Sequence, residues 1–211
     1  MKHLAVFTLL FALMTTPLAA TRLSVLSDGN LAGWESKSFS GETAYSTSEH
    51  DGQRCVQALA QGTASGMFRE MEVDLAKTPY LNWHWRVDNI YNNDGEQSKA
   101  GDDYPARIYV VKSGGALFWK TRVVSYVWSS HQPINTRWPN AYTDKAHMIA
   151  VRSGQPETGR WLVEKRNVRD DFMQAYGKDI TTIHAVAFMS DADNTGLSAS
   201  ACYGDIFFSS E

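Results

Sequence analysis

The sequence predicts an all-β fold, an antiparallel β-sandwich with one short surface helix. Two observations predict it. Apolar and polar residues alternate with a period of two in many short segments that are rich in β-branched and aromatic residues. Gly, Pro, Asn and Asp separate these segments, as turn residues do between strands. Many short strands in one domain favour two antiparallel sheets packed face to face.

The clearest strand is residues 81–87. Leu81, Trp83, Trp85 and Val87 fall on one face, and polar residues fall on the other. Further strands are predicted at residues 54–60, 66–75, 106–112, 122–129, 147–152, 161–167, 182–190 and 202–208.

One helix is predicted. Asn167 is a suitable N-cap, and Val168, Phe172 and Tyr176 recur at four-residue spacing on one side. Gly177 is a suitable stop. The pattern indicates a surface helix on a β scaffold.

Residues 1–20 are predicted to be a secretory signal peptide. Lys2 gives a positive start, residues 4–14 are almost continuously apolar, and Pro17 to Ala20 ends in small residues. The apolar run is shorter than the roughly twenty residues that span a bilayer. We therefore expect cleavage near Ala20, a periplasmic or secreted protein without membrane insertion, and a single β-sandwich domain in residues 21–211.

The charge of the chain is slightly negative. The full sequence has 20 Lys and Arg against 23 Asp and Glu, a formal charge of −3, and loss of Lys2 with the signal peptide makes it −4. Nucleic-acid and anionic-membrane binders usually carry a basic surplus. The overall charge argues against both classes of partner.

The two cysteines, Cys55 and Cys202, are expected to form a disulfide because an exported chain matures in an oxidising compartment. The alternative is that each is a small buried hydrophobic residue in its own strand. Neither has a second Cys or a His at the spacing of metal ligands, so a metal site there is not predicted.

The segment 89–103 is the most prominent loop, and long loops in compact domains are often functional. Asp102 and Asp103 end it, and Arg107 follows in a strand. The two carboxylates are candidates for cation binding or acid–base chemistry, and Arg107 is a candidate clamp for an anionic group. The alternative is an Asp–Arg pair that fixes the loop to the sheet.

The segment from Asp191 to Gly196 begins like a calcium loop. Cys202 stands where such a loop needs its bidentate Glu, which excludes an EF-hand. Asp191 and Asp193 are weak candidates for another oxygen-ligand site, and a tight turn held by Asp and Asn side chains is the alternative. No metal and no cofactor are predicted.

The chain has seven tryptophans, and aromatic faces are surfaces on which sugar rings stack. Most are expected in the core, notably Trp83 and Trp85. Trp119 and Trp138 lie in polar, turn-rich segments and are predicted to be exposed platforms. Trp128 is a further candidate ligand contact.

Alternation also places polar residues in same-face pairs on three strands. These pairs are His84 with Arg86, Arg107 with Tyr109, and Glu164 with Arg166. If the three strands are neighbours in one sheet, the pairs form a polar shelf suited to hydroxyl and carboxylate groups. The alternative is a solvated sheet face with cross-strand ion pairs.

The segments around Trp83 and Trp85, from Lys99 to Val111, from Tyr126 to Ser130, and from Tyr203 to Ile206 resemble a bacterial family of exported proteins, domain of unknown function 3047. The resemblance covers nearly the whole mature chain and implies no activity or catalytic residue. A looser likeness is to galactose-binding-type jelly-roll carbohydrate modules. It implies a jelly-roll fold, and a fold does not fix a function.

We interpret the sequence as a glycan-binding protein of the bacterial envelope. Arg86, Arg107 and Arg166 would meet anionic groups of a polysaccharide or oligosaccharide, and exposed Trp would stack on sugar faces. One alternative is a polysaccharide-cleaving enzyme with Asp103 and Glu164 as its carboxylate pair. No histidine pair at zinc-ligand spacing and no G-x-S-x-G motif is present. The third possibility is an envelope assembly protein without a small ligand.

Overall fold

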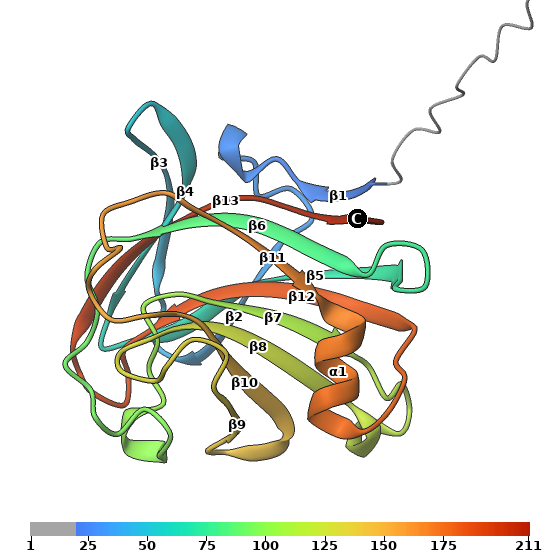
Figure 1. Ribbon diagram of the computed structural model, residues 1–211. Helices are drawn as coiled ribbons and strands as arrows, with labels where there is room; N and C mark the ends of the chain where they lie inside the picture. Colours follow the sequence, from blue (N-terminus) through green and yellow to red (C-terminus); the bar gives the residue numbers. More distant parts are fainter. Residues whose placement is uncertain (1–19) are drawn as a thin grey trace, which may run out of the picture.

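Two β-sheets pack face to face in the computed structural model, which describes residues 20–211 (Figure 1). The predicted signal peptide lies outside the described residues, apart from Ala20. Within residues 20–211, no helix is both long and apolar enough to cross a membrane.

The six-stranded sheet has the order β11-β6-β13-β4-β3, and β1 pairs with β13 at one end. Its strands are β1 (Ala20–Ser24), β3 (Ala44–His50), β4 (Gln53–Gln61), β6 (Tyr80–Val87), β11 (Leu162–Asn167) and β13 (Ser198–Ser209). All its pairings are antiparallel.

The seven-stranded sheet has the order β2-β5-β12-β7-β8-β10-β9. Its strands are β2 (Glu35–Ser40), β5 (Ala64–Asp74), β7 (Arg107–Lys112), β8 (Arg122–Ser129), β9 (Arg137–Asn140), β10 (Thr143–Ser153) and β12 (Thr182–Asp191). Its strands are antiparallel except that β10 runs parallel to β8. In the sequence β9 comes between β8 and β10, and it runs antiparallel to β10. The chain therefore reverses direction twice from β8 to β10, which makes these two strands parallel. The prediction of an all-β sandwich is confirmed.

The predicted helix is α1 (Val168–Tyr176). The side chain of Asn167 accepts a hydrogen bond from the backbone N–H of Asp170, and Gly177 ends the helix at φ 63°. A left-handed residue at this position favours glycine. The described part of the chain also has three single turns of 3-10 helix, at Leu26–Asp28, Lys99–Gly101 and Phe118–Lys120.

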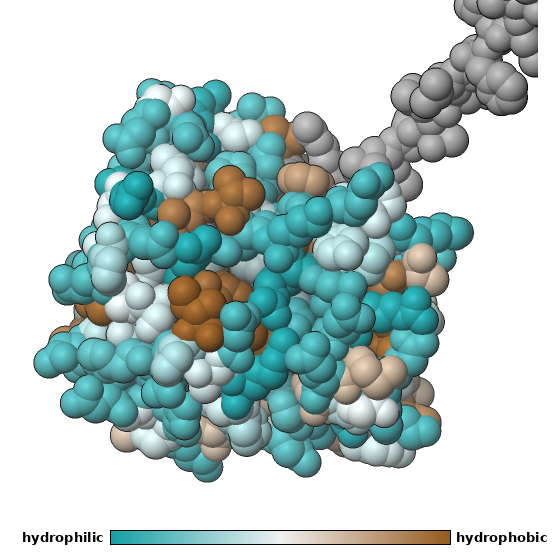
Figure 2. Space-filling model, in the orientation of Figure 1, coloured by the Kyte–Doolittle hydropathy of each residue, from teal (hydrophilic) through white to brown (hydrophobic). Residues whose placement is uncertain are grey.

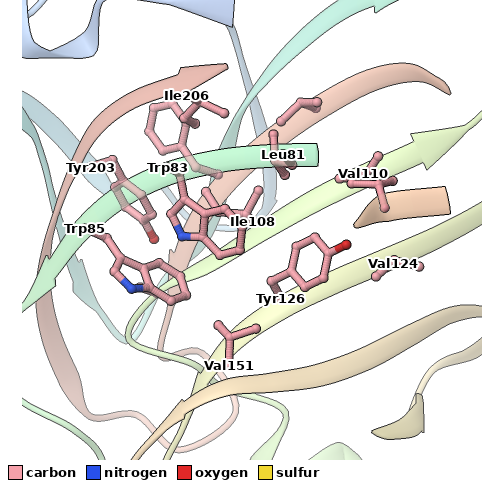
Figure 3. Close-up of a cluster of buried hydrophobic side chains, with 14 of the residues drawn as sticks. Leu81, Trp83, Trp85, Ile108, Val110, Val124, Tyr126, Val151, Tyr203 and Ile206 are labelled. Atoms are coloured by element: carbon pink, nitrogen blue, oxygen red, sulfur yellow. The ribbon is translucent and has the colours of Figure 1, made fainter. Parts of the chain in front are cut away.

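The core lies between the sheets, where large side chains from both layers meet (Figure 3). Trp83 of β6 stacks on Tyr126 of β8 with ring centroids 5.2 Å apart, and Trp85 lies 6.1 Å from Trp128. All four are fully or almost fully buried. The inward face predicted for residues 81–87 is therefore confirmed.

The predicted disulfide joins Cys55 of β4 to Cys202 of β13, with Cα atoms 5.7 Å apart. The two strands are hydrogen-bonded neighbours in the six-stranded sheet. The bond therefore links two adjacent strands covalently, through cysteines that are 147 residues apart in the sequence.

On the side of the molecule seen in Figure 2, the surface is mainly hydrophilic, with small separate hydrophobic patches. Large exposed apolar side chains are therefore informative where they gather beside polar groups.

Candidate functional site

A groove of 450 Å³ lies on the outer face of the seven-stranded sheet. Alternation along β7 positions its floor: Arg107, Tyr109 and Val111 line the groove, whereas Ile108 and Val110 point into the core. The other lining residues are Phe39, Ala64, Phe68, Asp102, Val123, Asn140, Tyr142, Thr143, Ala146, Met189, Asp191, Asp193 and Asn194.

An aromatic strip made of Phe39, Phe68 and Tyr109 forms one side of the groove. The rings of Phe68 and Tyr109 are nearly parallel at a centroid distance of 6.4 Å, and Phe39 lies 6.2 Å from Phe68. Phe39 is 58% exposed. Lys37 places its ammonium 5.6 Å from the Phe39 ring centroid. The strip offers a continuous apolar surface to a ligand.

Tyr142 lines the other side of the groove, because it connects β9 and β10 while Phe39 belongs to β2 at the opposite edge of the sheet. Its hydroxyl is 2.5 Å from Oδ1 of Asn194 and 3.1 Å from the carbonyl of Lys99. Lys99 also places its ammonium 5.4 Å from the ring centroid. The ring is thus held in place while its side chain is more than half exposed.

Carboxylate and amide groups line one end of the groove. Asn140 donates from Nδ2 to Oδ2 of Asp102 over 2.8 Å, whereas Oδ1 of Asp102 has no hydrogen-bond partner. Burial raises the pKa of Asp102, and the charge of Arg107 opposes that rise. The pKa of Asp193 is also raised, first by burial and then by the nearby charge of Asp103.

Arg107 is only 3% exposed and is held by carboxylates. Its Nε donates to Oδ1 of Asp191 over 2.9 Å, and a second ion-pair contact joins Nη2 to Oδ2. Nη2 also donates to the backbone carbonyl of Asp102 over 3.2 Å. These contacts fix the loop to the sheet, which is the alternative left open by the sequence. They leave Arg107 little capacity to clamp an anion.

The turn after β12 is held by a carboxylate from another loop. Asp103 accepts hydrogen bonds from the backbone N–H groups of Asn194 and Thr195 and from the Asn194 side chain. The tight turn held by Asp and Asn side chains, given above as the alternative, thus depends also on a carboxylate from outside the turn. Carboxylate oxygens of Asp103, Asp191 and Asp193 lie within 4.8 Å of one another, but Asp103 and Asp191 already accept hydrogen bonds with both oxygens.

The predicted carboxylate pair is not brought together in the groove, because neither Asp103 nor Glu164 lines it. Glu164 lies on β11 of the other sheet, where Trp85 donates to it over 3.1 Å and Arg152 over 2.6 Å. Burial raises the pKa of Glu164, and Arg152 opposes the rise. Glu164 is therefore engaged by hydrogen bonds and an ion pair within the protein, on the edge strand of its sheet.

The predicted polar shelf does not form. His84 and Arg86 lie on β6 of one sheet, and Arg107 and Tyr109 lie on β7 of the other. The third pair faces inward, because Arg166 pairs in register with buried Leu81. The β7 pair therefore lies in the other layer, and the β11 pair lies on the opposite face of the six-stranded sheet from the β6 pair.

The residues of these pairs have local partners instead. The His84 ring lies 5.3 Å from that of Trp161, and burial lowers the pKa of His84. Arg86 forms an ion pair with Asp88 over 3.1 Å. Nη2 of Arg166 forms an ion pair with Asp171 over 2.8 Å.

The predicted tryptophan contacts are corrected in two cases. Trp128 is fully buried in the core, so its faces are closed to a sugar. Trp138 is also buried, because it packs with Tyr104, Met148 and neighbouring residues in a second apolar cluster. Trp119 is 51% exposed, as expected, but it does not line the groove.

Sequence reasoning missed Phe39, Phe68, Asn140, Tyr142 and Asn194 as groove residues. Phe68 has a signal in its strand, since it alternates with inward-facing Met67. Phe39 is a lone aromatic residue in a serine-rich segment, and nothing in its sequence context shows that it faces Phe68 across two paired strands.

Two solved structures share the overall fold. The family 11 carbohydrate-binding module of the cellulosomal cellulase Lic26A-Cel5E of Clostridium thermocellum aligns with a TM-score of 0.50 and 12% identity, over 92% of this chain and 95% of the module. A cellulase derived from Cel12A of Rhodothermus marinus aligns with a TM-score of 0.50 and 8% identity, over 90% of this chain and 100% of the cellulase. At these identities the likeness shows the β-sandwich fold alone.

Sequence comparison gives the family. No curated protein matches the chain. Residues 32–207 match the family described as Protein of unknown function (DUF3047), and the chain belongs to that family.

Proposed function

We propose that this protein binds a neutral glycan chain in the groove of the seven-stranded sheet. One observation carries the proposal: the aromatic strip of Phe39, Phe68 and Tyr109 shares a groove with Asp102 and Asp193. Sugars present apolar C–H faces and hydroxyl edges, and this groove offers a partner for each.

The chemistry of the two parts is complementary. Aromatic faces stack on the C–H faces of pyranose rings, with geometry set by the π system. Ionised carboxylates accept hydrogen bonds only, so Asp102 and Asp193 suit hydroxyl donors. The amides of Asn140 and Asn194 both donate and accept, which suits hydroxyls in either role.

The charge of the groove favours a neutral glycan over an acidic one. Its lining includes Asp102, Asp191 and Asp193 but only one arginine, Arg107, which is ion-paired. The expectation that Arg86, Arg107 and Arg166 meet anionic sugar groups is replaced, because carboxylates of the protein occupy all three.

The similarity to a carbohydrate-binding module supports the proposal at the level of fold. The disulfide supports the accompanying proposal that the protein acts in an oxidising compartment outside the cytoplasm, after removal of the signal peptide.

Calorimetric titration with a panel of neutral and acidic oligosaccharides tests the function. Phe39→Ala should weaken binding of the best neutral ligand about tenfold, since a stacking contact contributes about 1.4 kcal/mol with its buried area. Phe118→Ala is the matched control, because Phe118 is also an exposed aromatic residue but lies outside the groove. The Phe118→Ala variant should bind the same ligand with the affinity of the wild type.

Acidification provides a second readout. Burial raises the pKa of Asp102, so its carboxylate takes up a proton at a higher pH than an ordinary Asp and loses acceptor capacity. Affinity should fall on acidification, and Asp102→Asn should flatten that profile. Absence of binding across the neutral panel contradicts the proposal. Release of new reducing ends would instead favour the hydrolase alternative.

A further inference from the structure

A second cavity, of 590 Å³, lies at the end of the sandwich opposite the loop before β7. Arg107 begins β7 next to the groove, and Lys112 ends it next to this cavity. The segment 113–121 follows, near α1 at that end of the molecule (Figure 1). The cavity is lined by Lys112, Ser113, Gly114, Gly115, Lys120, Arg122, Lys178, Ile180 and His184.

This basic cavity concentrates positive charge without a carboxylate. Its lining holds Lys112, Lys120, Arg122 and Lys178 and no Asp or Glu. Among the described residues, none of these four cations has an ion pair with a carboxylate. The neighbouring Asp179 is engaged by Arg169, which binds it with two contacts of 2.6 Å.

Six arginines elsewhere in residues 20–211 form ion pairs with acidic side chains. They are Arg86, Arg107, Arg137, Arg152, Arg166 and Arg169. Lys37, Arg54 and Arg69 also have no ion pair with a carboxylate among the described residues, so the distinguishing feature of this end is that four such cations line one cavity.

The register of the sheet makes this arrangement costly without an anion. Lys112 and Arg122 are directly opposite each other in the β7–β8 ladder. Like charges at opposite positions destabilise an antiparallel pair. Lys112 reaches only the carbonyl of Ser113, and Arg122 reaches those of Trp119 and Thr121. An external anion would relieve the repulsion between them.

His184 adds an unused polar atom to the same cavity. Its Nδ1 is buried and has no hydrogen-bond partner in the described residues. Buried polar atoms are normally paired, so an orphan in a cavity lining is consistent with a ligand that supplies the partner.

Exposed apolar side chains stand in the loop beside these cations. Phe118 is 68% exposed and Trp119 is 51% exposed, and their rings contact each other edge to face at 5.3 Å. Leu117 is partly exposed as well, and Lys145 places its ammonium 5.4 Å from the Phe118 ring centroid. Aromatic residues next to Lys and Arg are typical of protein segments that lie at a membrane–water interface.

We propose that this end of the sandwich docks on an anionic membrane surface. The cations of the basic cavity would bind the anionic headgroups, and Phe118 and Trp119 would enter the interfacial layer. The formal charge of the whole chain is negative, but charges beyond about 8 Å are largely screened at physiological ionic strength. The local excess of cations therefore decides which surface this end attracts.

Co-sedimentation with lipid vesicles tests the proposal. Residues 21–211 are used, because the predicted signal peptide would itself bind lipid and the core clusters lie within this segment. Vesicles of phosphatidylcholine alone are compared with equimolar phosphatidylcholine and phosphatidylglycerol. Binding is expected only to the anionic vesicles, and added salt should weaken it.

Variants separate the charge and apolar contributions. Lys120→Gln and Lys178→Gln should each weaken binding about fivefold, the effect expected for one basic residue near an anionic surface. Phe118→Ser should also weaken it. Lys37→Gln is the matched charge control, because this exposed lysine lies beside the aromatic strip, and it should bind vesicles like the wild type.

Three results would overturn the proposal. They are equal binding to both vesicle types, no effect of Lys120→Gln and Lys178→Gln, and no effect of Phe118→Ser. Titration with inorganic phosphate tests whether the cavity is instead a site for small soluble anions. If phosphate binding depends on Lys120 and the protein binds no vesicles, the proposal of membrane docking is rejected. Phe39→Ala should leave vesicle binding unchanged, so this proposal and the glycan proposal fail independently.

Discussion

Arg107→Met should destabilise the protein by about 3–5 kcal/mol, the range found when one partner of a buried ion pair is removed. The substitution keeps much of the side-chain length but leaves Asp191 and Asp102 buried without their cation. For a chain of this size, about 2–4 °C of melting temperature corresponds to each kcal/mol, so a fall of about 6–20 °C is expected.

The loss of stability caused by Arg107→Met should be smaller at acidic pH. Burial raises the pKa of Asp102, and removing Arg107 removes the charge that opposes that rise. A carboxyl whose pKa is higher in the folded than in the unfolded state binds more protons when folded. It therefore favours folding increasingly as pH falls through the window between the two values. The gap between variant and wild type should narrow on acidification.

Thermal denaturation followed by circular dichroism measures both effects. Arg107→Met combined with Asp191→Leu is the decisive control, because replacing a whole buried pair by apolar residues is often neutral or stabilising. Arg107→Lys should lie between the wild type and Arg107→Met, since it keeps the charge without the two-pronged geometry. A melting temperature of Arg107→Met equal to that of the wild type at neutral pH would refute the structural role assigned to this ion pair.

Two further predictions concern the six-stranded sheet. Replacing both Cys55 and Cys202 by Ala should cost roughly 5 kcal/mol for a closed loop of 147 residues, about 10–20 °C of melting temperature; equal melting of the oxidised wild type and the double variant would contradict this. Gly204→Ala should cost about 3 kcal/mol, because its Cβ would overlap the imidazole ring of His84. Adding His84→Ala should recover most of that stability, and no recovery would reject the steric explanation.

Strands that bury one face could be predicted from the sequence, because apolar and polar residues alternate along them with a period of two. Residues 81–87 are the clearest case, and α1 could also be predicted because Asn167 and Gly177 mark its ends. β2 could not be predicted in this way. All six of its residues are exposed, so no alternation records that the segment pairs with β5.

The groove was less predictable than the strands. Tyr109 and Asp102 could be selected from their segments, but their partners Phe39 and Tyr142 come from opposite edges of the sheet. Trp138 shows the converse error. Its polar sequence neighbours indicate exposure, whereas the loop that carries Tyr104 folds over it and removes it from water. Contacts made by loops across a sheet leave no periodic signal.

The position of β13 has a consequence for how the chain acquires its structure during synthesis. This strand follows the other twelve in chain order, yet it lies in the interior of its sheet, between β6 and β4. Until it is made, β6 and β4 have no common neighbour, Cys55 has no partner thiol, and β1 has no strand to pair with. Long-range pairings of this kind form slowly. The six-stranded layer therefore closes only after β13 itself has left the ribosome, and a nascent chain arrested before β13 exposes two open strand edges, those of β6 and β4, to proteases and chaperones.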